Sequence, residues 1–258
     1  FRCRKCDVPP MKVKFSKKDL KADGLKKANE LKLVVNCEIG NLEYQQLVLK
    51  EFLVYKLYNL LSDYSFNVQL INLRLIDSKT KKKYPWQIAY IIEDEEELGK
   101  RLDVEVLDTI GISKNTYSSL DYTRFQIFQY MVGNTDWVPT TCHNMQLVQT
   151  VDDDLIPIPF DFDFAGIVAA PYSTPNSWTS LTNVKQRFFL GNNKSSEEVE
   201  KVLEEFRAEK DAMIQVISEF TLIPNFQRKE MINYIKSFFE IIDEPSQFEP
   251  IFINNDPF

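Results

Sequence analysis

Glycine is scarce in this sequence, and its scarcity limits the phosphate-binding motifs that the chain can contain. Of 258 residues only 7 are glycine, and Gly24 is the only glycine before Gly40. The pattern G-x-G-x-x-G, whose backbone approaches phosphates closely, does not occur. A nucleotide site built on that loop is therefore not indicated by the residues present.

Histidine and cysteine are also rare, which restricts metal and nucleophile chemistry. His143 is the only histidine, and the cysteines are Cys3, Cys6, Cys37 and Cys142. Cys3 and Cys6 form a C-x-x-C pair, which is half of a zinc site, but a second pair is missing. A disulfide, for example between Cys6 and Cys37, and free thiols both remain open. A Ser–His–acid hydrolase lacks its G-x-S-x-G motif.

Positive charge and long apolar runs are missing too. The formal net charge is -7, which argues against a nucleic-acid binder that relies on neutralising phosphates. The one dense basic run, Lys79–Lys83, is typical of an exposed hairpin tip. No apolar stretch is long enough to span a membrane, and Phe1 does not begin a signal peptide. The abrupt start at FRCRKC predicts a fragment or the remainder of a longer precursor.

Hydropathy patterns divide the chain into a strand-rich part and a mostly helical part. Hydrophobic residues make up 44%, enough for a sizeable core. The patterns predict strands at 11–15, 31–37, 66–77, 84–94 and around MQLVQ and IPIPFDF, and helices at 43–61, 121–132, 195–220 and 228–242. A polar connection or short helix covers 93–101, a hinge falls within 93–105, and VDDD at 151–154 forms a turn. Ser195 and Glu198 predict a capping box. The predicted domains are 1–95 and 96–258.

Acids and amides gather in two neighbouring stretches, GNTDWVPTTCHN (133–144) and PIPFDFDFAG (157–166). Phosphoryl transfer needs a lysine at the phosphates, an acid that steadies it, a carboxylate at the acceptor, and oxygen ligands for a divalent metal. The chain offers such groups along its length: Lys32, Glu51, Asp136, Asn144 and an acid after a strand. The plainer alternatives are that Lys32 lies on the solvent face of an edge strand and that Asn134 and Asp136 only cap turns.

Several of these segments together resemble a known group of proteins. The segments are PPMKVKF, ELKLVVNC, the stretch from LVLKEFLVYKLYNLLSDYSFNVQL to IIEDEEELGKR, QYMVGNTDWVPTTCHN and PIPFDFDFAG. They are similar to an uncharacterised bacterial family that is distantly related to the kinase-like proteins of the spore-coat CotH and HipA type. The resemblance covers nearly the whole chain. It implies an α+β, protein-kinase-like two-lobe fold: a small antiparallel sheet with one long helix, then a mostly helical lobe with a polar β-hairpin.

The resemblance also implies roles for particular residues. Lys32 would bind phosphate and Glu51 would be its ion-pair partner, while Asp136 would act on the acceptor. Asn144 would bind metal together with Asp161 or Asp163, and both acids are candidates because side chains two apart on an extended segment point to the same side. The implied ligands are ATP and Mg²⁺ or Mn²⁺, and the family implies export to the periplasm or cell surface.

Two departures from ordinary kinases leave the function open. The kinase loop H-R-D-x-x-x-x-N has four residues between its Asp and Asn, whereas WVPTTCH separates Asp136 from Asn144. The glycine-rich loop lies before Phe1, is replaced, or has been lost with nucleotide binding. The sequence thus predicts an ATP-dependent phosphotransferase with an unknown acceptor, protein or small molecule. The alternative is an inactive pseudokinase that acts as a binding or scaffolding module, and a metal-dependent hydrolase fits less well.

Overall fold

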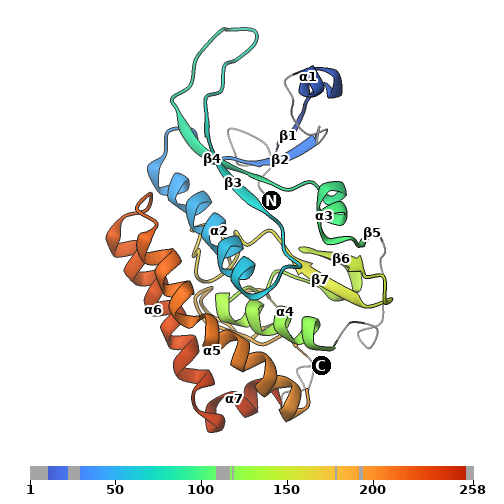
Figure 1. Ribbon diagram of the computed structural model, residues 1–258. Coiled ribbons are helices and arrows are strands. Elements are labelled where there is room, and N and C mark those ends of the chain that lie inside the picture. Colours follow the sequence, from blue (N-terminus) through green and yellow to red (C-terminus); the bar gives the residue numbers. More distant parts are fainter. Residues whose placement is uncertain are drawn as a thin grey trace.

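The computed structural model describes residues 11–22, 30–108, 117, 119–177, 179–191 and 194–253. Within these ranges the chain forms two small antiparallel sheets and seven α-helices (Figure 1). The predicted α+β class is therefore confirmed. None of the helices in the described part of the chain combines the length and hydropathy that a membrane span requires.

The first half of the chain contributes a four-stranded antiparallel sheet in the order β1-β2-β4-β3. Its strands are β1 (Met11–Lys14), β2 (Glu30–Val34), β3 (Val68–Leu73) and β4 (Gln87–Ile92). Three helices accompany the sheet: α1 (Lys17–Ala22), α2 (Leu42–Leu61) and α3 (Glu95–Leu102). In the register of the sheet, Lys32 on β2 lies between Lys12 on β1 and Ile92 on β4.

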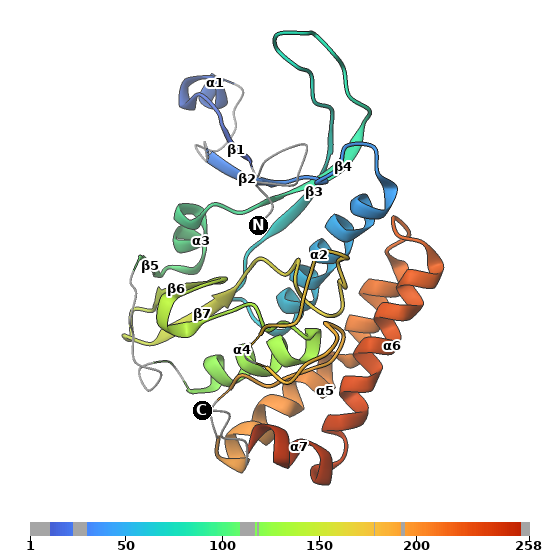
Figure 2. The same ribbon diagram turned by 180° about the vertical axis from the view of Figure 1, so that it is seen from behind.

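Helix α2 is apolar on most of its faces because it is covered on both sides. Its N-terminus is capped by Asn41, whose side-chain oxygen accepts hydrogen bonds from the backbone of Glu43 and Tyr44. Leu53, Val54 and Leu57 are fully buried. The helix runs between the four-stranded sheet and α5, as Figure 2 shows. It therefore joins the sheet to the helical half of the molecule.

The second half consists of helices around a three-stranded sheet in the order β5-β6-β7. Its elements are β5 (Glu105–Leu107), α4 (Ser119–Val132), the short 3-10 helix η3 (Pro139–Thr141), β6 (Met145–Gln149), β7 (Leu155–Pro159), α5 (Ser196–Glu219), α6 (Asn225–Ile242) and α7 (Pro245–Phe252). One apolar core includes buried side chains from α2, α4, α5, α6 and α7. The two halves thus share a core.

Most predicted elements are present, but some bounds differ and some elements were not predicted. Strand β2 ends at Val34, earlier than expected, and the sequence did not predict α1, β5 or α7. The predicted boundary at 95/96 falls inside the first turn of α3, which occupies most of the predicted hinge. The capping box is only half formed. The Ser195 hydroxyl accepts from the Glu198 backbone, but the Glu198 carboxylate bonds to the Thr123 hydroxyl instead of reaching back.

Two further expectations concern exposed residues and cysteine. The predicted lysine-rich tip is exposed, and Asp77 organises it by accepting hydrogen bonds from the backbone of Lys79 and Thr80. Cys37 is in a disulfide bond. Its predicted partner, Cys6, and the zinc half-site formed with Cys3 lie outside the described residues.

Gly133 ends α4 and starts the segment that carries Asp136. Its carbonyl accepts a hydrogen bond of 3.0 Å from the backbone of Gly166, so the two polar stretches of the sequence are tied together. Gly133 has φ +69°, and a Cβ atom there would meet the Tyr234 hydroxyl at 2.1 Å. Tyr234 is not able to yield easily because the Arg187 guanidinium stacks 4.0 Å from the centre of its ring.

We expect Gly133→Ala to lower the free energy of unfolding by about 2–5 kcal/mol, since backbone strain and overpacking add. Gly40→Ala is the matched control, because Gly40 also has a positive φ, +85°, but its nearest neighbour would lie at an ordinary 3.8 Å. That control should cost only about 1–2 kcal/mol. Urea denaturation of both variants measures the difference, and equal losses would contradict the crowding at Gly133.

Candidate functional site

All six residues singled out in the sequence line one cleft. The cleft has a volume of about 660 Å³ and lies between the four-stranded sheet and the segments that flank β6 and β7. Lys32 and Glu51 come from β2 and α2. The acids and the amide from the second half are Asp136, Asn144, Asp161 and Asp163. Residues separated by more than 100 positions thus share one solvent-filled space.

The long spacer between Asp136 and Asn144 folds back on itself. Val138 and His143 form an antiparallel bridge around η3, with backbone hydrogen bonds of 3.0 and 3.2 Å. Consequently Asn144 lies against Asp136 although seven residues separate them. Its Nδ2 donates to the Asp136 carbonyl at 2.7 Å and to carboxylate Oδ2 at 3.0 Å. The seven-residue spacer therefore does not separate Asp136 from Asn144 in space.

The Asp136 carboxylate is held from both sides. Nε2 of His143 lies 3.3 Å from Oδ1, while Asn144 donates to Oδ2. The Asn134 side chain accepts a hydrogen bond from the Asp136 backbone, as expected for a turn residue, and is itself buried. The capping interpretation is thus correct for Asn134. Asp136 itself remains 37% exposed at its side chain and faces the cleft.

The two acids after β7 do not lie on an extended strand. Strand β7 ends at Pro159, and Asp161 has φ +59°. The expectation that Asp161 and Asp163 lie on an extended segment is therefore wrong. The left-handed turn is held by a hydrogen bond of 2.9 Å from the Asp161 backbone N–H to the Tyr55 hydroxyl oxygen. Both side chains nevertheless line the cleft.

Phe162, between Asp161 and Asp163, anchors this turn in the core. It is fully buried, and its ring packs edge-on against Tyr55 on α2 and Phe128 on α4, at centroid distances of 4.9 and 5.8 Å. Asp163 is only 5% exposed. Asn144 also has a left-handed backbone, φ +55°. Asn and Asp tolerate this region better than other residues, and such conformations gather at functional sites.

Lys32 forms its ion pair with Glu95 instead of the expected Glu51. Its Nζ lies 2.5 Å from Oε1 of Glu95 in the first turn of α3, and 5.3 Å from the centre of the Phe160 ring. No motif distinguishes Glu95 from the other acids in the run EDEEE. Glu51 is 2% exposed and lines the same cleft from α2. Lys32 is thus ion-paired with Glu95, whereas it shares with Glu51 the lining of the cleft.

Asn144, Asp161 and Asp163 carry oxygen groups of the kind that magnesium or manganese takes from a protein. Magnesium that is shared with phosphates takes one or two carboxylates, with phosphate and water completing its shell. These three residues, with one amide and two carboxylates, all line the cleft. Among the described residues, no group of three or more His, Cys, Asp or Glu side chains is placed so that it could hold a metal ion.

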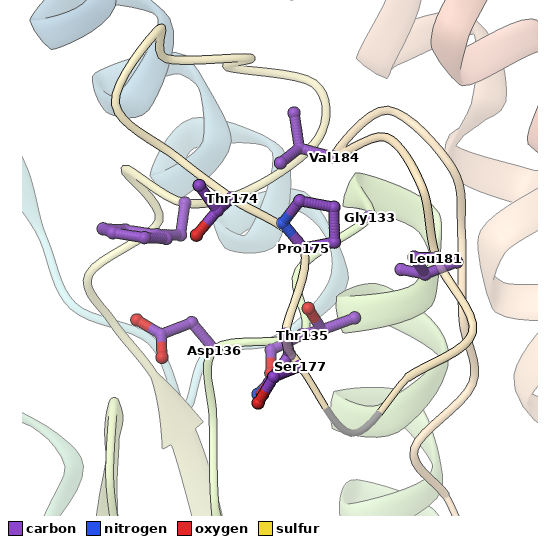
Figure 3. A pocket seen from close by; sticks show the side chains of 10 residues that line it. Gly133, Thr135, Asp136, Thr174, Pro175, Ser177, Leu181 and Val184 are labelled. Carbon is purple, nitrogen blue, oxygen red and sulfur yellow. The ribbon is translucent and has the colours of Figure 1, made fainter.

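A second cavity, of about 310 Å³, adjoins the cleft (Figure 3). It is lined by the turn after α4, by Phe164, and by residues within 174–177 and 181–184. Its lining residues are Gly133, Thr135, Asp136, Phe164, Thr174, Pro175, Asn176, Ser177, Leu181 and Val184. Sequence analysis missed the last of these parts because STPNS and the residues after it have no periodicity and match no motif. Its run of small polar residues was the only available signal.

Comparison with known proteins adds no relative. The chain matches no protein-family model, and it matches no curated protein significantly.

Proposed function

We propose that the protein is an ATP-dependent phosphotransferase with a kinase-like two-lobe arrangement. The observation that carries this proposal is the 660 Å³ cleft, where a lysine and the acids needed for phosphoryl transfer line one space. Their order along the chain, from Lys32 on a strand to Asp161 after a strand, supports the same conclusion. Buried side chains of α2 belong to one core with those of β4 and of the helices in the second half. This packing fits a cleft between a small sheet and a helical part.

Each group has a role that its position supports. Lys32 would bind phosphate oxygens, and either Glu51 or Glu95 would keep its ammonium in place. Asp136 would accept the proton of the acceptor hydroxyl, with His143 and Asn144 holding its carboxylate in one orientation. Asn144, Asp161 and Asp163 would hold Mg²⁺ or Mn²⁺. Such an ion, when bound, would neutralise charge on the phosphates.

The disulfide at Cys37 supports a location outside the reducing cytosol. Disulfide bonds persist in oxidising compartments and are rare elsewhere in most organisms. We therefore propose the periplasm or the cell surface as the site of action. ATP would have to be present there, or another nucleotide would replace it.

Thermal unfolding with ATP and Mg²⁺ or Mn²⁺ tests the proposed function. A ligand at about 100 times its dissociation constant stabilises the folded state by about 2.7 kcal/mol, which corresponds to a rise in Tm of about 5–10 °C for a chain of this size. We expect this rise in the wild type only when metal is present, and its loss in Asp161→Ala.

The matched control is Asp152→Ala, which removes an exposed carboxylate at the tip of the β6–β7 hairpin. It should keep the full nucleotide-dependent rise. If no nucleotide and no metal changes the Tm of the wild type, the phosphotransferase proposal fails and the pseudokinase alternative, a binding module, takes its place.

A further inference from the structure

The 310 Å³ cavity lies where an acceptor would have to bind. Asp136 and Phe164 line both this cavity and the 660 Å³ cleft, so the carboxylate stands at the boundary of the two spaces. Figure 3 shows Asp136 and Thr174 on facing sides of the open centre of the cavity. A hydroxyl in the cavity would therefore meet Asp136 on one side and a phosphate in the cleft on the other.

The walls of the cavity are held together by hydrogen bonds from their own residues. The Asn176 side chain donates to the Thr135 carbonyl at 3.4 Å, which connects its own segment to the turn after α4. The Asn176 carbonyl accepts from both the backbone and the hydroxyl of Thr179, at 3.0 and 2.7 Å. Asn176 and Thr179 thus hold the described part of this segment, 174–177 and 179–181, in place as a wall of the cavity.

The chemistry of the lining favours a neutral acceptor rich in hydroxyl groups. Among the described lining residues, Asp136 carries the only charge. A phosphorylated or carboxylated acceptor would place negative charge beside that carboxylate without a lining cation to offset it. The hydroxyls of Thr135, Thr174 and Ser177 offer donors and acceptors to a polyol. Leu181 and Val184 offer apolar surface to its C–H faces.

The size of the cavity restricts the acceptor further. Ligand pockets span about 300–1,000 Å³, and this cavity stands at the lower end of that range. We propose that it binds the acceptor of the reaction, and that the acceptor is a neutral sugar or polyol of about monosaccharide size. This proposal rests on the proposed function, because it assigns the second substrate of the same site.

The transfer step balances with the two substrates alone. The acceptor oxygen forms a bond to the γ-phosphorus, and the bond from that phosphorus to the β,γ-bridging oxygen breaks with its electron pair on ADP. The acceptor proton passes to the Asp136 carboxylate and then to water. The products are a sugar or polyol phosphate monoester, ADP and one proton.

A panel of candidate acceptors tests the assignment by release of ADP from ATP. The neutral members are glycerol, glucose, mannitol and inositol, and the charged members are glycerol 3-phosphate and glucose 6-phosphate. Serine-containing peptides represent a protein acceptor. We expect turnover with at least one neutral member and none with either phosphorylated member.

Two tryptophan variants connect turnover to the cavity. Ser177 lines the cavity and is exposed, so Ser177→Trp fills the space without disturbing the core. We expect the KM for the accepted polyol to rise by about tenfold or more, since binding is removed. Ser180→Trp is the matched control: Ser180 is exposed in the same segment but does not line the cavity. It should leave the KM unchanged, and the Tm of both variants checks their folding.

The outcomes separate this proposal from the one on which it rests. Nucleotide-dependent stabilisation without turnover of any neutral member, or with turnover of peptides or phosphorylated sugars only, overturns the acceptor assignment and leaves the nucleotide site standing. An equal rise in KM for Ser177→Trp and Ser180→Trp also overturns it. Absence of nucleotide-dependent stabilisation means that the proposed function itself has failed, and the acceptor assignment falls with it.

Discussion

Replacing Asp136 by asparagine is expected to lower the rate of phosphoryl transfer by about 10²–10⁴-fold, the usual contribution of a general base. Asparagine has nearly the shape of aspartate, and its side-chain oxygen can still accept from Asn144. The loop around η3 should therefore keep its fold, while the group that accepts the proton is gone. ADP release measures the loss, with the accepted polyol or, for the slow transfer to water, without an acceptor.

Binding of the nucleotide separates this loss from a loss of folding. Asp136→Asn should keep the rise in Tm with ATP and metal, because the ligand groups Asn144 and Asp161 remain. Asp152→Asn, the same change at the exposed hairpin tip, should keep the full transfer rate. Wild-type activity in Asp136→Asn would show that Asp136 only shapes the turn, as its neighbour Asn134 does.

Local sequence signals predicted the elements that carry the site. The spacing of Val199, Val202 and Phe206 predicted α5, and these side chains are fully buried on it. The apolar faces of α2 likewise predicted a helix that is covered on most sides. Both signals are local: burial repeats with the period of the helix in α5, and apolar helix formers follow one another in α2. The acids after β7 were found from a different local signal, since aspartate is unusual next to buried strands.

Features that depend on tertiary contacts could not be predicted in this way. The left-handed turn at Asp161 exists because the Tyr55 hydroxyl, from α2, meets its backbone. Glu95 reaches Lys32 because α3 begins directly after β4, at the edge of the cleft. The part of the chain that forms the cavity wall, 174–177 and 179–181, shows no hydropathy periodicity and matches no motif. In each case the partner is distant in sequence and only the fold brings it near.

Because the chain folds back at η3, the groups that would act in the 660 Å³ cleft lie beside those that would act in the 310 Å³ cavity. If WVPTTCH were extended, Asn144 would lie far from Asp136, and the proposed metal ligands would be separated from the proposed acceptor cavity. Because Val138 and His143 pair instead, Asn144 contacts both the carbonyl and the carboxylate of Asp136. Asn144, which would hold metal, is thus in direct contact with Asp136, which would accept the proton.

Lys32→Met is expected to lower the transfer rate by about 10²–10³-fold, the effect of removing one donor that stabilises charge in the transition state. Methionine keeps the apolar part of the side chain, so the strand should remain intact. Lys14→Met is the matched control, since Lys14 lies on β1, is 70% exposed at its side chain and does not line the cleft. The control should keep the wild-type rate.

The ion pair of Lys32 with Glu95 gives this prediction a second, sharper test. The two side chains are 32% and 42% exposed, and exposed pairs contribute only about 0–1 kcal/mol. Glu95→Gln should therefore change the rate by less than about fivefold, whereas a hundredfold loss would show that Glu95 has the role expected of Glu51. Lys12 lines the same cleft from β1. A loss in Lys12→Met without one in Lys32→Met would assign the phosphate to Lys12, because the two lysines face each other in the sheet register.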